Sequence, residues 1–261
     1  MARPGPLRAL LALFVVLCAM LLAARCRAAE PGRPARLRAR VLRVLPHDPA
    51  AYTQGLLWHR GELYESTGQY GSSRLRRVAL ETGEVLRERR LADSVFGEGL
   101  ARVGDRLIQL SWQSRRGWVW DLETFEELGQ VTYDSEGWGL CHDGSRLWMS
   151  DGSDRLVRRD PGTFAALGEL AVTFEGRPVP QLNELECAEG WIYANVYGTD
   201  QIVRIDPVTG AVTALIDASG LLAAEERESA DVLNGIAYDP DRELFYLTGK
   251  LWPRLFEVVF E

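Results

Sequence analysis

A turn phrase centred on threonine recurs along this chain of 261 residues. Its copies are Leu-Glu-Thr-Gly at 80–83, Leu-Glu-Thr-Phe at 122–125, Pro-Gly-Thr-Phe at 161–164 and Pro-Val-Thr-Gly at 207–210. The four threonines are 42, 39 and 46 residues apart. Self-similarity at such a period is typical of repeat folds, in which each copy forms one supersecondary unit.

A second phrase keeps the same spacing and consists of a polar or aromatic residue, a small residue and an aliphatic residue. Its copies begin at Gln54, Glu98, Trp138, Asn183 and Asn234. Glycine is the second residue in every copy except the one at Asn183, where Glu184 replaces it. These copies define four units of 40 to 51 residues and a shorter fifth unit.

Within a unit, apolar and polar residues alternate over four short runs, separated by Gly, Asp or Asn, which is the period of β-strands. In the fourth unit the runs are 185–188, 191–196, 201–205 and 212–216. Residues 221–227 are expected to add one or two helical turns inside an insertion. Four strands in a unit of this length indicate a propeller blade. The sequence therefore predicts an all-β fold, a five-bladed β-propeller with four antiparallel strands per blade.

The fifth unit has room for three strands, at 235–238, 244–248 and 255–260. The run 37–45 precedes the first unit and mixes Leu, Val and Arg. An open propeller would leave two unpaired sheet edges, so we expect this N-terminal strand to close the last blade. Its three arginines suit an exposed outer strand.

The first 29 residues differ from the rest of the chain. Basic residues precede an apolar run at 9–24, and small residues follow it, as in a secretory signal peptide. An uncleaved anchor is the alternative, although the run is short for a membrane span. We therefore expect a signal peptide at 1–29, a single propeller domain at 30–261, a secreted or periplasmic location and no membrane attachment after cleavage.

The charge and the cysteines limit the possible partners. The formal net charge of −7 becomes −11 without residues 1–29, which hold four Arg and no acid. Such a chain is not expected to bind nucleic acid or anionic membranes. Cys141 and Cys187 remain in the mature chain, as one disulfide in an oxidising compartment or as two buried thiols. The three histidines do not have metal-ligand spacing, so we expect no metal and no cofactor.

The residues that begin the second phrase are the first candidates for a functional site. Inner strands begin each unit, so these side chains should point to one mouth of the central channel. They differ between almost all units, whereas a pure scaffold would repeat them, and this indicates a binding or catalytic site. Divergence without function is the alternative.

Further candidates stand out by residue type. Lys250 is the single lysine among 30 basic residues, and a buried ammonium has a shiftable pKa that Arg lacks. Glu98 lies between two glycines, and burial among aromatic side chains should raise its pKa. Most of the aromatic residues are expected in the core, but Trp112 ends a second strand and Trp138 begins a first strand, so these two are expected at the site.

Six segments in order resemble the glutaminyl-peptide cyclotransferases (glutaminyl cyclases) of the plant-latex type, which also occur in bacteria. The segments are 52–56, 65–73, 96–100, 182–186, 193–196 and 233–250. The resemblance implies a five-bladed propeller that converts the N-terminal glutamine of peptides or proteins to pyroglutamate, releases ammonia and needs no catalytic metal. We expect a monomer whose partners are peptides or proteins with an N-terminal glutamine.

The resemblance also assigns roles to residues. It implies Glu98 as the central acid/base residue, with Lys250 and Asn183 as catalytic partners and Gln54 as a polar contact for the substrate. Further substrate contacts are the side chains Trp112, Trp138, Phe96, Tyr52, Tyr197 and Asn234. The family usually has Phe at position 52 and Trp at position 197, so both departures keep an aromatic ring and concern substrate fit.

Two other functions are compatible with the sequence. A non-catalytic propeller could bind a peptide or a protein partner across the same face. A metal-dependent propeller of the lactonase type would need carboxylates and amides to converge on the axis, which Glu98, Asn183 and Asn234 could supply.

Overall fold

Strands make up most of Pro34–Glu261, the larger of the two units into which the chain divides. The computed structural model describes residues 33–261, so the signal peptide expected at 1–29 lies outside the described residues. Within residues 33–261, no helix has the length and apolar character needed to cross a membrane.

Three sheets have four strands each, all antiparallel and paired in sequence order. The first contains β2 (Thr53–His59), β3 (Glu62–Thr67), β4 (Arg74–Ala79) and β5 (Val85–Arg90). The second contains β6 (Gly97–Val103), β7 (Arg106–Ser111), β8 (Arg116–Asp121) and β9 (Glu127–Thr132). The third contains β10 (Leu140–His142), β11 (Leu147–Met149), β12 (Arg155–Arg159) and β13 (Ala166–Ala171).

The remaining long strands form one sheet of eight, in the order β16-β17-β18-β19-β1-β22-β21-β20. Their bounds are β16 (Leu182–Ala188), β17 (Trp191–Val196), β18 (Gln201–Ile205), β19 (Val212–Asp217), β1 (Ala35–Pro46), β22 (Arg254–Phe260), β21 (Leu244–Gly249) and β20 (Leu233–Asp239). A small hairpin, β14 (Thr173–Phe174) and β15 (Arg177–Pro178), and the short helix α2 (Ala224–Arg227) complete the described elements.

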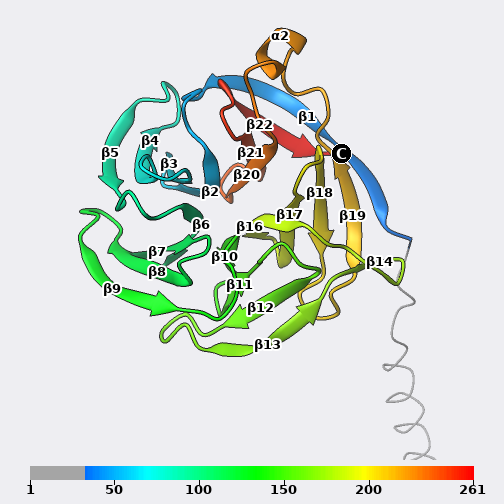
Figure 1. Ribbon diagram of the computed structural model, residues 1–261. Coiled ribbons are helices and arrows are strands. Elements are labelled where there is room, and N and C mark those ends of the chain that lie inside the picture. Colours follow the sequence, from blue (N-terminus) through cyan, green and yellow to red (C-terminus); the bar gives the residue numbers. More distant parts are fainter. Residues whose placement is uncertain (1–32) are drawn as a thin grey trace, which may run out of the picture. The chain divides into compact units, whose positions relative to one another are not determined.

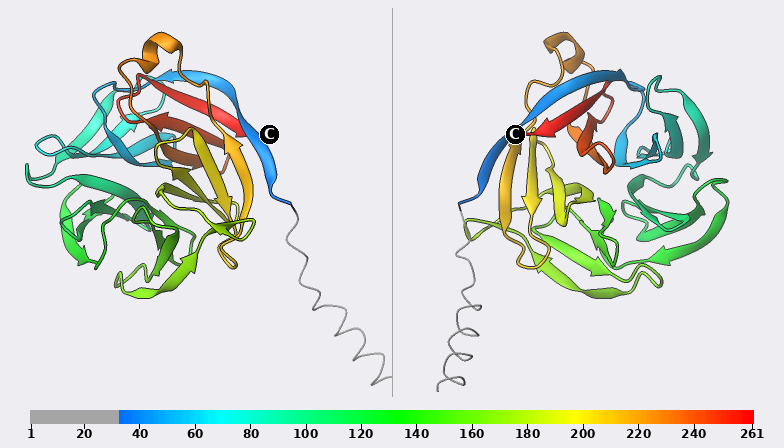
Figure 2. Two further views of the ribbon diagram at one scale, coloured as in Figure 1. Left: turned by 45° about the vertical axis from the view of Figure 1, so that its right-hand side comes forward. Right: turned by 180° about the vertical axis from the view of Figure 1, so that it is seen from behind.

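Strand β1 joins the two halves of the eight-stranded sheet. Its second half runs antiparallel to β22, with Ala39 opposite Phe260, as expected from the sequence. Its first half runs parallel to β19, with Ala35 opposite Ala214, which was not expected. The cause is length, because β1 has 12 residues and β22 has 7, so β1 extends past its partner to the next sheet. Figure 2 shows β1 lying along both strands.

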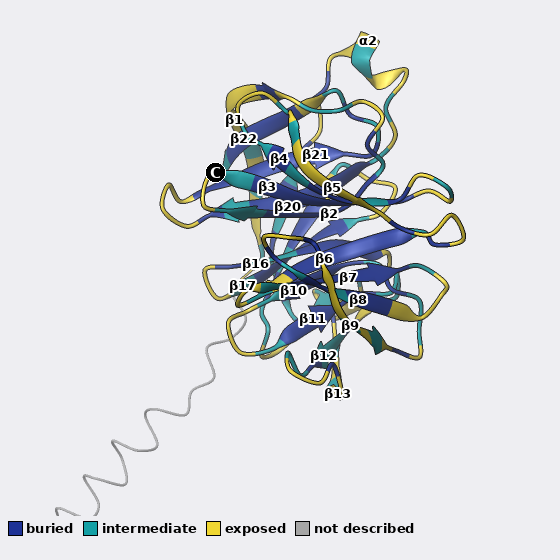
Figure 3. Ribbon diagram, turned by 90° about the vertical axis from the view of Figure 1, so that its left-hand side faces the viewer, coloured by how far each residue is buried: buried dark blue, intermediate teal, exposed yellow. Residues whose placement is uncertain are grey.

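The sheets are arranged around a common axis (Figure 1). Each four-stranded sheet forms one group of strands, and the eight-stranded sheet contains two groups, β16–β19 and β20–β22 with β1. The first strand of each group, not counting β1, is innermost. The inner strands β2, β6, β10, β16 and β20 contact one another in a closed circuit. A separate hydrophobic cluster fills each junction between neighbouring groups, as with Leu57, Tyr64 and Trp120 between the first and second sheets. The inner strands are accordingly buried, while the outer strands β5 and β9 are largely exposed (Figure 3).

Candidate active site

Four of the five inner strands, all except β10, have a β-bulge at the second phrase. The strand register shifts between Thr53 and Gly55 in β2, between Gly97 and Leu100 in β6, between Leu182 and Leu185 in β16 and between Leu233 and Ile236 in β20. A bulge locally redirects side chains, and bulges occur often beside active sites. The bulges place Gln54, Glu98 and Asn183 at one mouth of the channel.

The glycine that follows Gln54 and Glu98 is required by the crowding of the inner strands. A Cβ atom on Gly55 would lie 2.6 Å from the backbone nitrogen of Leu100 on the next inner strand. One on Gly99 would lie 2.6 Å from the nitrogen of Leu140. The repeated glycine therefore packs adjacent sheets, and the residue before it is free to differ.

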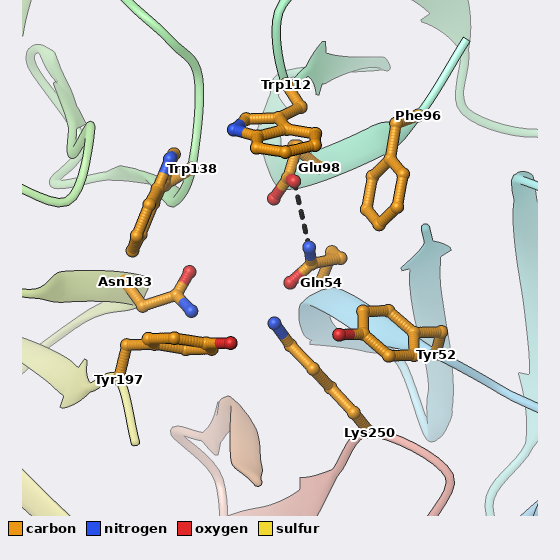
Figure 4. A pocket seen from close by; sticks show the side chains of 9 residues that line it. All are labelled: Tyr52, Gln54, Phe96, Glu98, Trp112, Trp138, Asn183, Tyr197 and Lys250. Atoms are coloured by element: carbon orange, nitrogen blue, oxygen red, sulfur yellow. Dashed lines mark hydrogen bonds between the residues drawn. The ribbon is translucent and has the colours of Figure 1, made fainter. Parts of the chain in front are cut away.

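A cavity of about 330 Å³ opens at this mouth. Nine residues line it: Tyr52, Gln54, Phe96, Glu98, Trp112, Trp138, Asn183, Tyr197 and Lys250. All were predicted as site residues, and they come from every group of strands around the axis. Figure 4 shows their side chains converging on one space.

Aromatic rings form the walls of the cavity. On one side, the ring of Phe96 contacts those of Tyr52 and Trp112 edge to face, with centroids 5.9 and 5.6 Å apart. On the other side, the Trp138 ring lies 5.7 Å from that of Tyr197. Rings with few rotatable bonds form a flat slot that can hold a flexible side chain in one conformation. The two positions that depart from the usual family residues, Tyr52 and Tyr197, both belong to these walls.

Glu98 lies at the buried base of the slot, 3% exposed. Its carboxylate accepts a hydrogen bond of 2.8 Å from the Gln54 amide (Figure 4). Burial raises the pKa of Glu98 well above the ordinary carboxyl range; the nearby Glu136 adds to this, and Lys250 and Gln54 oppose it. A carboxyl whose pKa is raised in this way holds a proton more readily than an ordinary carboxyl, which suits a group that accepts and returns a proton.

Lys250 faces Glu98 across the cavity and is 3% exposed. Its ammonium lies 4.9 Å from the ring centroids of both Tyr52 and Tyr197, so the two rings hold it by cation–π contacts. Burial lowers the pKa of Lys250, against the attraction of Glu98 and Asp231. The site thus sets a cation and an acid on opposite sides of one small space.

The two asparagines occupy different positions. Asn183 lines the cavity, and its Oδ1 is buried without a hydrogen-bond partner in residues 33–261. Asn234, which was expected to contact substrate, is not among the lining residues. It is fully buried behind Gln54, where its amide donates to Gln54 Oε1 at 3.2 Å and to the Thr53 carbonyl at 2.9 Å. The bulge in β20 turns Asn234 toward β2, so it supports Gln54 instead of facing the cavity.

The sequence reasoning missed Glu136. Its carboxylate accepts hydrogen bonds from the indole N–H groups of Trp112 and Trp138, at 2.7 and 3.0 Å. Glu136 lies two residues before Trp138, a predicted site residue, and this position was the available signal. Glu136 belongs to neither of the two repeated phrases.

Cys141 on β10 and Cys187 on β16 form a disulfide between neighbouring inner strands, with Cα atoms 5.5 Å apart. Of the two alternatives that the sequence left open, the structure thus has the disulfide. Among residues 33–261, no three His, Cys, Asp or Glu side chains converge as metal ligands. Glu98 and Asn183 share the cavity, but the third residue of the lactonase-type alternative, Asn234, lies behind it.

A family model described as glutamine cyclotransferase matches residues 12–260, nearly the whole chain. The chain belongs to this family. A curated glutaminyl-peptide cyclotransferase of Arabidopsis thaliana is 42% identical over 224 residues, which cover 84% of this chain and 70% of that protein.

One solved structure agrees with the membership in the glutamine cyclotransferase family, and a second is similar in fold. The crystal structure of Myxococcus xanthus glutaminyl cyclase matches with a TM-score of 0.80 and 41% identity, covering 88% of this chain and 99% of that chain. The β-propeller domain of Swd1 from Myceliophteria thermophila matches with a TM-score of 0.50 and 10% identity, covering 84% of this chain and 99% of that domain. The second likeness concerns the fold alone and agrees with a propeller-like arrangement of four-stranded sheets.

Proposed function

We propose that this protein cyclises the N-terminal glutamine of peptides and proteins to pyroglutamate with release of ammonia. One observation carries the proposal: a buried carboxyl, Glu98, lies at the base of an aromatic slot with Lys250 opposite. The membership in the glutamine cyclotransferase family and the names of its relatives support the same reaction.

The reaction is intramolecular, which suits this slot. The substrate's α-amine attacks its own γ-carboxamide carbon and closes a five-membered ring, so the enzyme must mainly fold the side chain back and hold it there. The facing rings of Trp112, Trp138 and Phe96 are suited to this confinement. A free α-amine has a pKa of about 7.7 to 8.0, so much of it is neutral at mildly alkaline pH.

Glu98 is the proton shuttle in this proposal. As the amine nitrogen bonds to the carbonyl carbon, the Glu98 carboxylate takes a proton from that nitrogen. It then returns the proton to the amide nitrogen, the C–N bond breaks, and ammonia leaves. Gln54 orients this carboxylate through its 2.8 Å hydrogen bond, and Asn234 orients Gln54 in turn. A positioned acid/base group of this kind contributes about 10² to 10⁴ in rate.

The oxyanion that develops on the carbonyl oxygen needs donors. The Lys250 ammonium and the Asn183 amide face the cavity, and we assign this role to them. In this mechanism Glu98 carries out both proton transfers, and Lys250 and Asn183 stabilise the developing negative charge. We therefore propose that turnover is metal-independent.

The proposal also includes the number of blades, the oligomeric state and the location of the protein. We count five blades, because the eight-stranded sheet divides into β16–β19 and β20–β22 with β1 as the outer strand. We also propose that the protein acts as a monomer. The disulfide supports a secreted or periplasmic location, with residues 1–29 as the export signal and 30–261 as the mature domain.

Ammonia release from a glutamine-initiated dipeptide tests the proposal. Release should be stoichiometric with pyroglutamate and unchanged after prolonged dialysis against a strong chelator. The matched control is the same dipeptide with an acetylated α-amine, which cannot cyclise and should release nothing. Ammonia from the acetylated peptide would indicate a simple amidase. Binding of the free peptide without ammonia would favour the non-catalytic propeller, and activity restored specifically by zinc or calcium would overturn metal independence.

A further inference from the structure

Glu136 connects the two tryptophan walls of the slot, although it is not among the residues that line the cavity. Trp112 follows β7 in the second sheet, and Trp138 precedes β10 in the third sheet. One oxygen of Glu136, Oε2, accepts the indole N–H of both, at 2.7 Å from Trp112 and 3.0 Å from Trp138. Figure 4 shows the two indole nitrogens turned toward the same corner of the site.

The surroundings of Glu136 keep it ionised. Burial alone would raise its pKa, but the N–H donors of Trp138, Trp112 and Gln113 outweigh burial and lower the pKa. An ionised acceptor makes stronger hydrogen bonds than a neutral one. The backbone closes the same corner, because the Gly137 N–H donates to the Trp112 carbonyl at 3.1 Å.

We propose that Glu136 is a positioning residue for the cyclisation reaction, fixing the indoles of Trp112 and Trp138, which belong to opposite walls of the slot, relative to each other and acting through its charge on Glu98. The proposal rests on the function proposed above. Its first part is geometric, because two walls that come from different sheets keep a fixed angle only if a contact ties them together. Small errors in such confinement are costly, since a displacement of about 1 Å can reduce turnover about 100-fold.

The second part concerns the proton shuttle. The charged and titratable groups around Glu98 are Glu136, the Lys250 ammonium and the phenols of Tyr52 and Tyr133. The negative charge of Glu136 opposes ionisation of Glu98, whereas Lys250 favours it. Removing the charge of Glu136 should therefore lower the pKa of Glu98 and make its carboxylate available at lower pH.

Two substitutions separate these parts. In Glu136→Gln, the amide oxygen can still accept from both indoles, but the charge is gone. The acid limb of the pH profile of kcat/KM should move to lower pH, while the maximal kcat stays within a few-fold of the wild type. In Glu136→Met, which keeps the length but has no acceptor, kcat should fall about 10- to 100-fold. The matched control is Asp134→Asn, which removes an exposed charge two residues away and should change neither quantity.

A spectroscopic measurement makes the test independent of turnover. With ¹⁵N-labelled tryptophan, Glu136→Met should shift two indole N–H resonances, identified through Trp112→Phe and Trp138→Phe. Unmoved resonances together with wild-type kcat would overturn the positioning role. An acid limb unchanged in Glu136→Gln would overturn the electrostatic role. If the wild type releases no ammonia while the resonances shift as expected, the proposed function fails and the tie between the indoles stands.

Discussion

The turns at the outer edge of the sheets and the starts of the inner strands are both repeated features, but they repeat in different ways. In the outer turns the same hydrogen bond recurs: the hydroxyl oxygens of Thr82, Thr124, Thr163 and Thr209 each accept a backbone N–H two residues later, at 3.2 to 3.3 Å. At the inner strand starts each side chain has its own partners. Gln54 donates to Glu98, Asn234 donates to Gln54, and Asn183 Oδ1 has no partner in residues 33–261.

The difference separates scaffold from chemistry. A position that makes the same bond in every unit stabilises the unit, and its sequence can repeat. Side chains that face the common axis contact side chains from the other units. Identical residues there would give the cavity several copies of one chemical group instead of a set of different groups. The site forms at the positions where the units differ in sequence, and these positions can be located from the sequence alone.

The largest effect is expected at the periphery, where β1 closes the circuit. Deletion of residues 30–45 removes the partner of β22 and leaves β19 and β22 as unpaired edges, so no cooperative thermal unfolding should be seen by circular dichroism. The control is Arg40→Ser, which loses only the exposed ion pair with Glu261, worth about 0–1 kcal/mol. A truncated protein that melts and turns over normally would contradict closure by β1.

The next effect is expected at the axis and concerns activity. Glu98→Gln keeps size and hydrogen bonding but cannot shuttle a proton, so kcat should fall roughly 100-fold or more while binding of a glutamine peptide changes little. Steady-state kinetics and calorimetry measure the two quantities, with the exposed Glu88→Gln as control. Near-normal turnover would mean that the acid/base residue lies elsewhere.

Lys250→Arg tests whether charge alone suffices. The planar guanidinium cannot occupy the space of a compact ammonium between the rings of Tyr52 and Tyr197, so kcat should fall roughly 10-fold or more. Arg158→Lys, the reverse exchange on an outer part of the third sheet, should leave kcat unchanged. Equal kcat in both variants would remove Lys250 from the catalytic groups.

Glu184 offers an axial position whose role is structural. It is fully buried and accepts the backbone N–H groups of Leu56 and Ile236, at 3.2 and 2.8 Å. Burial, and then Glu186, raise its pKa well above the ordinary carboxyl range. The folded state therefore binds this proton more tightly than the unfolded state, and stability should fall as the pH rises through the raised pKa, with a slope of up to about 1.4 kcal/mol per pH unit.

Glu184→Gln removes this titration. It should be about 1–3 kcal/mol less stable than the wild type at acidic pH, because its NH₂ group faces one of the two backbone donors. Urea unfolding at several pH values should show the deficit narrowing as the pH rises. A deficit that grows with pH would mean that the ionised form of Glu184 is the stabilising one.

The smallest effect is expected at a single outer turn. Thr163→Ala removes the repeated hydrogen bond from the Ala165 N–H and the bond that the Thr163 hydroxyl donates to Asp160 Oδ1. It should lower the free energy of unfolding by about 0.5–1.5 kcal/mol for each bond lost, with no change in kcat. Denaturant unfolding and the ammonia assay measure both. A loss of activity without a loss of stability would contradict the conclusion that the outer turns stabilise the fold and only the inner strands contribute to the reaction.

Most strands could be predicted because their signals are local. The runs proposed for the fourth unit lie within β16 to β19, and the alternation of Val, Ile and Leu with polar residues fixes them. The nine lining residues were also predictable, since they combine position in the repeat with family motifs. The bulges were not, because a register shift depends on how the next inner strand packs. For the same reason Asn234 was expected in the cavity, and Glu136 escaped notice because its role depends on two rings from different sheets.

The pairing of β1 with β22 has a consequence for how the chain is made. Arg40 and Glu261 bond across 221 residues, so β1 is synthesised well before its partner β22, and the circuit can close only after β22 has been made. Until then both edges stay available to other strands, a state prone to aggregation. If the chain is exported before it folds, as the proposed location implies, these edges form only in the compartment where the disulfide between Cys141 and Cys187 also forms. The pairing of β1 with β22 thus makes closure of the circuit depend on strands from opposite ends of the described residues.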